Sequence, residues 1–170
     1  MIKRKYDIAE LRERVRYEPD TGRLFWVRPF ERAYRVKAGT PAFTSLNRCY
    51  RQGSFGGQGI YAHVAAWLIH YGEYPIGDID HINQDGSDNR ISNLRDVPHA
   101  VNGHNAGVRS HNTSGHKGVS LRKTTGRWHS YINVDGKRKQ LGTFADINDA
   151  VAARRDAELR HFPELYSDVR

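Results

Sequence analysis

The chain has 170 residues, of which 38% are hydrophobic, and its Lys and Arg outnumber its Asp and Glu by 27 to 19. The single cysteine, Cys49, excludes an internal disulfide and a cysteine-based zinc cluster, and the longest apolar stretch, residues 60–69, is too short to span a bilayer. The charged opening "MIKRKYDIAELRERV" is unlike a signal peptide, so we expect a soluble intracellular protein with a polyanionic partner, above all nucleic acid.

The first part of the chain alternates short helices and strands. Residues 7–16 place apolar side chains at helical spacing, which predicts a short amphipathic helix. "EPDTG" then predicts a turn and "RLFWV" a strand, while residues 29–47 show no clear pattern. "CYRQGSFGGQGIYAHV" predicts two strands joined by a glycine turn, and "HVAAWLIHYG" predicts a helix that stops at Gly72.

A polar segment, "IDHINQDGSDNRISNLRDVPHAVN", follows at residues 79–102. Its centre has the Asp-Gly, Asn and Ser residues of a loop. We expect short extended pieces on either side, at residues 79–81 and 93–97, and a helix that begins at Pro98 and covers residues 98–105. Residues 103–116 are rich in Gly, Ser and Asn, which predicts a linker.

Three strands and a helix are predicted after the linker. The strand-like pieces are "GVSLRK", "RWHSYINV" and "KRKQLGTF", and the turns between them are typical of hairpins. Asp146 is a suitable N-cap for the helix in "DINDAVAARRDAELRHF". Residues 109–144 hold eight Lys or Arg and one acid, which indicates a phosphate-facing surface, whereas the rest of the chain is close to balanced.

The pair Asp80-His81 suggests hydrolytic chemistry. Neighbours in a strand point to opposite faces, so the imidazole can face a substrate while the carboxylate reaches a metal. Carboxylate and amide oxygens are hard ligands that suit Mg²⁺ or Mn²⁺ better than zinc. Such a cation beside a neutral imidazole is what hydrolysis of a phosphodiester needs. The alternative is that these residues serve only the turn, as in many loops.

The order of motifs resembles that of the HNH homing endonucleases of phage and intron contexts. The resemblance rests on "DHINQDGSDNRISNLR" with Asn102 further on, preceded by "YEPDTGRLFW" and "YAHVAAWLIHYGEYP", and it covers most of residues 16–105. It implies a ββα-metal fold with one divalent cation. It also implies a chain encoded by a phage or an intron, acting in the cytoplasm of a bacterial host.

Carried over residue by residue, the resemblance implies that His81 is the general base and that Asp80 and Asn102 hold one Mg²⁺ or Mn²⁺. Asn93 matches the middle Asn of the motif, which braces the loop through backbone hydrogen bonds, and we count it with His81 as catalytic. His99 and His104 lie close to Asn102 in sequence and compete for its role.

Asn89 and Arg90 take structural positions in the same loop. Related chains often have His-Arg where this chain has His63-Val64, so any phosphate contact from that arginine is missing or supplied elsewhere. A zinc site made by His99, His104, His111 and His116 is a weaker alternative, because the chain offers no cysteine partners.

One face of the predicted C-terminal sheet has the composition of a DNA reader. Alternation sends Trp128, Ser130, Ile132 and Val134 toward the helix, and the polar and aromatic residues the other way. Such a face fits the major groove, although a solvated face is the alternative. The predicted DNA-binding residues are Lys117, Arg122, Arg127, His129, Tyr131, Asn133, Arg138 and Gln140.

The C-terminal stretch resembles the DNA-binding domain of plant ethylene-response factors, which phage endonucleases also carry. The shared spine is "KGV…W…I…LGTF…A…A" over residues 115–162. Ser120 stands where plant members show an Arg, so their base preference cannot be carried over.

Together these observations predict an α+β protein with an HNH nuclease domain at residues 1–105, a linker at 106–114 and a DNA-binding domain at 115–165. The predicted activity is site-specific, metal-dependent cleavage of double-stranded DNA to 5′-phosphate and 3′-hydroxyl ends, by a monomer or a homodimer. A non-cleaving DNA-binding regulator on the same scaffold is the alternative, and a structural packaging protein is a third.

Overall fold

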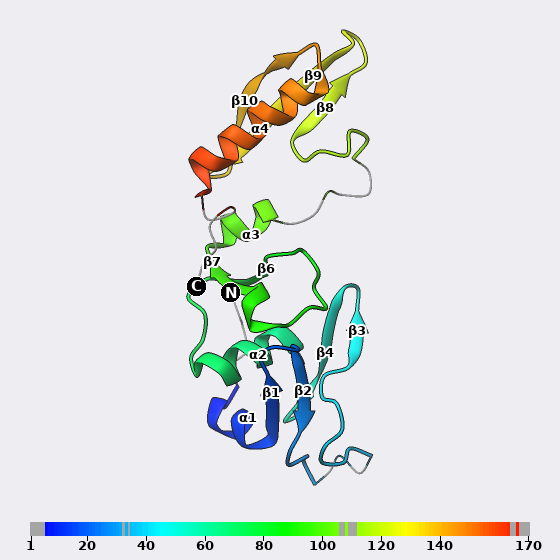
Figure 1. Cartoon of the computed structure of the whole chain (residues 1–170), viewed down its shortest axis with the longest axis vertical. Helices are drawn as coiled ribbons and strands as arrows, with labels where there is room; N and C mark the ends of the chain where they lie inside the picture. Colours follow the sequence, from blue (N-terminus) through cyan, green and yellow to red (C-terminus); the bar gives the residue numbers. More distant parts are fainter. Residues whose placement is uncertain are drawn as a thin grey trace. The chain divides into compact units, whose positions relative to one another are not determined.

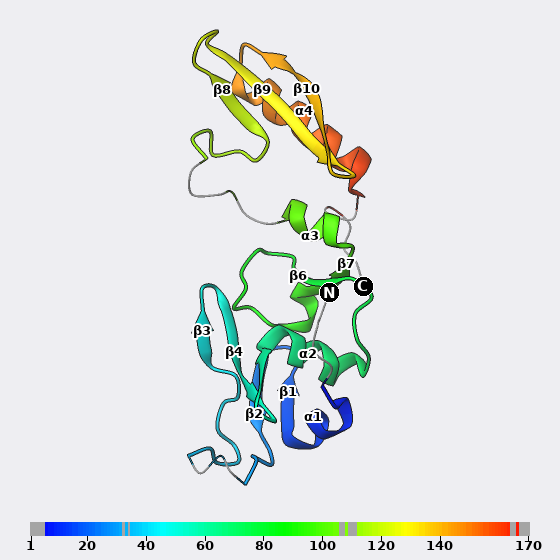
Figure 2. The same ribbon diagram turned by 180° about the vertical axis from the view of Figure 1, so that it is seen from behind.

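The computed structural model describes residues 6–31, 33, 35–105, 108, 112–163 and 166. The chain divides into two compact units, Met1–Asn102 and Gly103–Arg170. The described residues form four α-helices and small antiparallel sheets, which confirms the predicted α+β class (Figures 1 and 2). None of the helices in these ranges combines the length and the apolar character needed to cross a membrane.

The first unit opens with α1 (Ile8–Arg14), β1 (Val15–Glu18) and β2 (Arg23–Trp26). Asp7 caps α1 by accepting a hydrogen bond from the Glu10 amide. The prediction of a helix to residue 16 is wrong at its end, because Val15 pairs with Trp26 across the β1–β2 hairpin and is buried there. Tertiary pairing outweighs the helical spacing of this β-branched residue.

A second sheet, with order β3-β4-β5, comes from β3 (Ser45–Asn47), β4 (Tyr50–Phe55) and β5 (Gln58–Tyr61). The β4–β5 hairpin agrees with the predicted pair of strands, whereas β3 lies in the stretch that showed no pattern. Helix α2 (Ala62–Tyr71) follows directly and ends at Gly72, which adopts a φ of 79°.

The core of this unit lies between α2 and the two sheets. Helix α2 contacts α1, β1, β4 and β5, and its face of small and branched side chains is buried. Trp26 packs edge-on against Phe43 and Phe30, which extends the core toward the loop after β2. The unit therefore presents a rigid base to the polar segment that follows in sequence.

The polar segment folds as a third antiparallel pair, β6 (Asp78–His81) and β7 (Leu94–Val97), followed by α3 (His99–Asn105). A short 3-10 turn, η1 (Ile91–Asn93), leads into β7. These elements lie where the sequence predicted extended pieces and a helix. Strand, loop, strand and helix in this order place Asp80 and His81 at the end of β6.

The second unit is a three-stranded antiparallel sheet, of order β10-β9-β8, packed on one helix. Its elements are β8 (Val119–Arg122), β9 (Arg127–Val134), β10 (Lys137–Phe144) and α4 (Ile147–His161). Asp146 caps α4 by accepting a hydrogen bond from the Asn148 amide, as predicted. Figures 1 and 2 show α4 on one face of the sheet, while the other face carries no helix.

Much of the predicted linker falls outside the described residues, at 106, 107 and 109–111. The described part, from Asn112, forms a hydrogen-bonded turn. The Asn112 carboxamide oxygen accepts bonds from the amides of Ser114 and Gly115, and the Ser114 hydroxyl donates to the Val119 carbonyl. These residues are therefore tied to the start of β8.

Candidate active site

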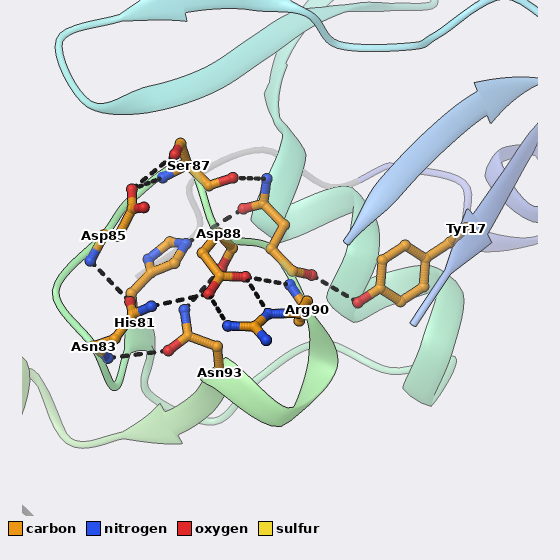
Figure 3. A network of polar contacts seen from close by, with 9 residues as sticks. Tyr17, His81, Asn83, Asp85, Ser87, Asp88, Arg90 and Asn93 are labelled. Carbon is orange, nitrogen blue, oxygen red and sulfur yellow. Dashed lines mark hydrogen bonds and ion pairs between the residues drawn. The ribbon is translucent and has the colours of Figure 1, made fainter. Parts of the chain in front are cut away.

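The loop between β6 and β7, residues 82–93, is held by polar side chains (Figure 3). The Asn83 amide oxygen accepts a bond from the Asp85 amide at 2.9 Å, and the Asp85 carboxylate accepts bonds from the amide and hydroxyl of Ser87 at 2.9 and 2.8 Å. Asn and Asp side chains satisfy backbone donors that no strand partner can reach. The amides of the polar segment thus give the loop its shape.

Asn93 joins the two ends of this loop. Its side-chain oxygen accepts a bond from the Asn83 amide at 3.0 Å, and its nitrogen donates to the Asp88 carbonyl at 2.8 Å. The Arg90 guanidinium beside Asp88 lowers the pKa of that carboxyl to about 2. The carboxylate therefore stays charged at neutral pH, and its bonds to Arg90 and Asn83 persist.

The β1–β2 hairpin supports the loop from behind. The buried hydroxyl of Tyr17, labelled in Figure 3, donates to the Asn89 carbonyl at 2.7 Å. The Pro19 carbonyl accepts a bond from the Ile91 amide at 3.0 Å. Burial raises the pKa of Tyr17, so its proton stays in place. Gly22, at φ 71°, lies so close that a Cβ there would be 2.6 Å from the Arg90 nitrogen.

His81 is enclosed by two aromatic side chains and one amide. Its Nε2 lies 3.3 Å from the Asn89 side-chain oxygen, and its ring centroid is 5.1 Å from that of His63 and 5.7 Å from that of Tyr50. Burial lowers the pKa of His81 and lowers that of His63 to about 3, so both rings are neutral at neutral pH. Only 5% of His81 is exposed, and the more exposed Tyr50 is among the rings that cover it.

Asp80 is held in a buried ion pair. Its Oδ2 accepts bonds from Nε and Nη2 of Arg95, its cross-strand neighbour on β7, at 3.0 and 2.9 Å. Arg95 is 2% exposed and Asp80 is 6% exposed. A pair this far from solvent needs both partners, because removal of either leaves an uncompensated charge. Arg95 thus fixes the carboxylate beside His81.

Asn102 bonds to a different carboxylate from the one predicted to share its cation. Its side-chain nitrogen donates to Asp78 at 3.2 Å, and Nδ1 of His99 also contacts Asp78. Asp78 and Asp80 are two residues apart in β6, so they lie on the same face of the strand. The described structure therefore brings Asn102 to the carboxylate two residues before Asp80.

The residue types fit a hard divalent cation, although no complete cage is formed. Among the described residues, no group of three or more His, Cys, Asp or Glu side chains is arranged to hold a metal ion. Asp80 and Asn102 supply carboxylate and amide oxygens, the donors that Mg²⁺ and Mn²⁺ prefer. A cation at Asp80 would meet the Arg95 guanidinium as a competitor for the same carboxylate.

His104 belongs to the second unit, and its contacts are made there. Its Nε2 contacts the Asn133 carbonyl at 2.9 Å, its Nδ1 lies 3.2 Å from Arg154, and its ring stacks on Phe162. With both ring nitrogens engaged, His104 has a structural role. Of the four histidines considered for zinc, His111 is outside the described residues, and the described ones form no metal cluster.

The uncovered face of the C-terminal sheet holds seven of the eight predicted DNA-binding residues. Ser130, Ile132 and Val134 of β9 are buried toward α4, so the alternate residues of β9 face the other way. Cross-strand pairing adds side chains of β8 and β10 to that outer face. The seven residues are Arg122, Arg127, His129, Tyr131, Asn133, Arg138 and Gln140.

Two basic residues of this unit behave differently. The Arg138 guanidinium lies 4.0 Å from the centre of the Tyr131 ring, which fixes a cation on the outer face. The Lys117 ammonium instead donates to the carbonyls of Gly103 and His104, at 2.7 and 3.1 Å. Lys117 therefore closes the end of α3 in the described structure rather than joining the outer face.

Sequence reasoning missed Arg95, Tyr50 and the support from the β1–β2 hairpin. Arg95 could have been found from the sequence. It lies in a short strand predicted next to the strand of Asp80, and a charged residue buried in such a strand needs a partner of opposite charge. Tyr50 and Tyr17 carried no such signal, since their contacts with the loop span large sequence separations.

Comparison with protein families gives a match over the segment that contains the candidate active site. A family model described as HNH endonuclease matches residues 60–104, which run from the end of β5 to α3 and include Asp80, His81, Asn93 and Asn102. The chain thus contains an HNH endonuclease domain, of a family of phosphodiester hydrolases that act on DNA. Comparisons with curated proteins and with solved structures give no significant match.

The contact at Gly22 predicts a sharp difference between two glycines. Gly22→Ala should destabilise the protein more than Gly39→Ala, because both have positive φ but only Gly22 abuts backbone. We expect roughly 1–2 kcal/mol for the strain at Gly39, and roughly 1–3 kcal/mol more at Gly22. Urea denaturation measures both, and equal losses would show that the hairpin does not support the loop.

The Asp80–Arg95 pair predicts strong coupling in a double-mutant cycle. Arg95→Met alone should cost roughly 3–5 kcal/mol of unfolding free energy, because it leaves the Asp80 carboxylate buried without its partner. Adding Asp80→Asn should recover part of that loss. If the losses caused by the two substitutions simply add in the double variant, the pairing is contradicted. Chemical denaturation of the four proteins measures the coupling.

Proposed function

We propose that the protein is a site-specific, divalent-metal-dependent DNA endonuclease of the homing type, which leaves 5′-phosphate and 3′-hydroxyl ends. The observation that carries this proposal is the match of residues 60–104 to the HNH endonuclease family, because the matched segment contains Asp80, His81, Asn93 and Asn102. The hairpin and loop that hold these residues support it.

In this proposal His81 takes a proton from water, whose oxygen attacks phosphorus as the 3′ oxygen leaves. The neutral state of its imidazole suits a proton acceptor, and Asn89 orients the ring through the contact at Nε2. Asp80 and Asn102 would hold the cation, which when bound stabilises charge on the phosphate and on the leaving oxygen. Asn93 keeps the loop closed around the imidazole.

Water must reach His81 for this chemistry, and the position of Tyr50 beside His81 makes it a candidate to control access. His81 is 5% exposed, whereas Tyr50 begins β4 at the solvent-exposed tip of the β3–β4 hairpin. A Cβ at Gly86 would lie 2.7 Å from the Tyr50 ring, so the loop backs this side chain directly. We assign Tyr50 as the side chain that moves when DNA enters.

The C-terminal unit supplies site preference in this proposal. Its outer face combines three arginines with His129, Tyr131, Asn133 and Gln140, and none of these positions is acidic. Arginine, asparagine and glutamine can form paired hydrogen bonds with base edges in the major groove. Its three-stranded sheet on one helix agrees with the architecture expected of an ethylene-response-factor-like domain.

A non-cleaving DNA-binding regulator is the second candidate. The enclosed His81 and the Asp80–Arg95 pair favour it, because a working nuclease must open the first and bring a cation to the second. Metal-dependent cleavage separates the two candidates.

Loss of the imidazole should abolish cleavage without loss of DNA binding. We expect His81→Ala to lower the cleavage rate by roughly 10²–10⁴-fold, the contribution of a general base. The assay incubates the protein with the genomic DNA that flanks its coding sequence, in the presence of Mg²⁺ or of EDTA, and maps the ends of the products. His161→Ala, on α4, serves as the control.

Either of two results would contradict these assignments. If DNA affinity falls as far as activity in His81→Ala, the role of His81 as base is wrong. If the unaltered protein makes no Mg²⁺-dependent cut, the endonuclease proposal fails and the regulator remains.

Basic residues on the two faces of the C-terminal sheet allow a matched test of the reader face. Arg127→Gln with Arg138→Gln removes two charges from the outer face, whereas Lys137→Gln with Lys139→Gln removes two from positions that pair with Val134 and Ile132. The first pair should reduce the slope of log K against log salt concentration by about two, because two phosphate contacts are lost, and should weaken site preference. Equal effects of the two pairs would exclude this face as the reader.

A further inference from the structure

A cleft of about 380 Å³ opens in the first unit beside the active-site loop. One wall comes from β2 and the segment at residues 41–44, another from Arg51 of β4, and the third from Ser87 and Asn89 of the loop. The site that holds His81 and this cleft therefore share the residue Asn89.

Two exposed arginines, Arg23 and Arg51, line the cleft, and neither forms an ion pair among the described residues. Glu18 lies opposite Arg23 across the β1–β2 hairpin, but its carboxylate is bonded to Arg16 and Thr21. Six other arginines of this unit are engaged by acids or carbonyls within the described structure, namely Arg12, Arg14, Arg16, Arg28, Arg90 and Arg95. Arg35 and Arg48 are also exposed without an ion pair among the described residues, but they lie outside the cleft. The guanidinium groups of Arg23 and Arg51 are exposed within it, so an anion from outside can reach them.

The remaining lining matches a nucleotide backbone better than an isolated anion. The partly exposed Phe25 gives apolar surface above the buried Leu24 and Phe43, while Thr21, Thr44 and Ser87 add hydroxyl groups, and no lining residue is acidic. A sugar can rest on the apolar surface while its phosphates meet the guanidinium groups, which favour phosphate as a partner.

The cleft is also rigidly joined to the proposed chemistry. Asn89 lies in both places, its carbonyl is fixed by the Tyr17 hydroxyl at 2.7 Å, and its side-chain oxygen lies 3.3 Å from His81. Gly22, another lining residue, abuts the backbone of Asn89 and Arg90. A strand bound in the cleft would therefore be held at a fixed place relative to the imidazole.

We propose that this cleft binds the sugar-phosphate backbone of DNA next to the phosphate that is cut, with Arg23 and Arg51 as its phosphate contacts. This inference rests on the proposed function, and it assigns to the nuclease unit a DNA contact of its own. The contact is independent of base sequence, because only backbone groups are recognised.

The test measures binding of the full chain to duplex DNA over a range of salt concentrations, in a His81→Ala background that leaves the DNA intact. Arg23→Gln with Arg51→Gln should reduce the slope of log K against log salt concentration by about two. The same change should weaken binding to all sequences equally. Arg23→Lys with Arg51→Lys retains the charges and should keep most of the slope.

A control pair removes the same net charge outside the cleft. Arg35→Gln with Lys37→Gln alters two exposed positions that do not line it, and neither has an ion pair among the described residues. Thermal melting checks that each variant is folded. With His81 restored, the cleft variant should lower kcat/KM while the mapped ends stay the same, because site choice belongs to the other unit.

The outcomes separate this inference from the proposed function. If the cleft pair and the control pair change the slope equally, the cleft does not bind the backbone, while Mg²⁺-dependent cleavage by the unaltered protein would still support a nuclease. If the unaltered protein does not cut DNA, the nuclease proposal fails, and a slope change confined to the cleft pair would still establish the contact.

Discussion

The backbone of Asn89 and Arg90 has almost no freedom, and the geometry of the candidate site depends on that restraint. Tyr17 binds the Asn89 carbonyl, Gly22 lies in backbone contact on the other side, and Asn93 closes the loop by bonding to the Asp88 carbonyl. A loop of this polarity buries too little apolar surface to hold its shape alone. The N-terminal hairpin provides the missing support, so the nuclease unit needs residues well before the HNH segment.

Enclosure has a consequence for charge. His81 and Asp80 lie in surroundings where a lone charge is costly, and each is matched to that condition: the imidazole is neutral, and the carboxylate is paired with Arg95. A divalent cation entering this site adds positive charge next to Arg95. A cation at this site therefore competes with the Arg95 guanidinium for the Asp80 carboxylate, and it must also lose bound water to enter.

Sequence patterns predicted those parts of the fold that depend on local periodicity or turn chemistry. The end of α2 at Gly72, the N-cap at Asp146 and the alternation along β9 all follow from short-range rules. These rules placed Val15 in a helix, which is wrong because Val15 pairs with Trp26, eleven residues further along the chain. Val64, a position where the resemblance led us to look for an arginine, is an apolar residue buried in the core, so a phosphate contact must come from another position.

The candidate site shows the same division between local and long-range information. A resemblance in sequence indicated Asp80, His81, Asn93 and Asn102, and their roles stay predictions until cleavage is measured. It could not indicate that Asn102 contacts Asp78, or that Tyr50 covers His81, because these contacts depend on how a hairpin and a helix pack. Such contacts decide whether a set of residue types becomes a working site, which is why the residues around the motif carry as much information as the motif itself.

Two basic surfaces in one chain also solve a problem that neither solves alone. The proposed backbone contact in the nuclease unit would give affinity without sequence preference, since every DNA sequence presents the same phosphates. The proposed reader face on the other unit would give sequence preference, and joining the two in one chain would raise the local concentration of each at the other's site. Arg23 and Arg51 in one unit, and Arg122 and Arg127 in the other, form no ion pair among the described residues, and they lie on the two surfaces to which these proposals assign DNA contacts.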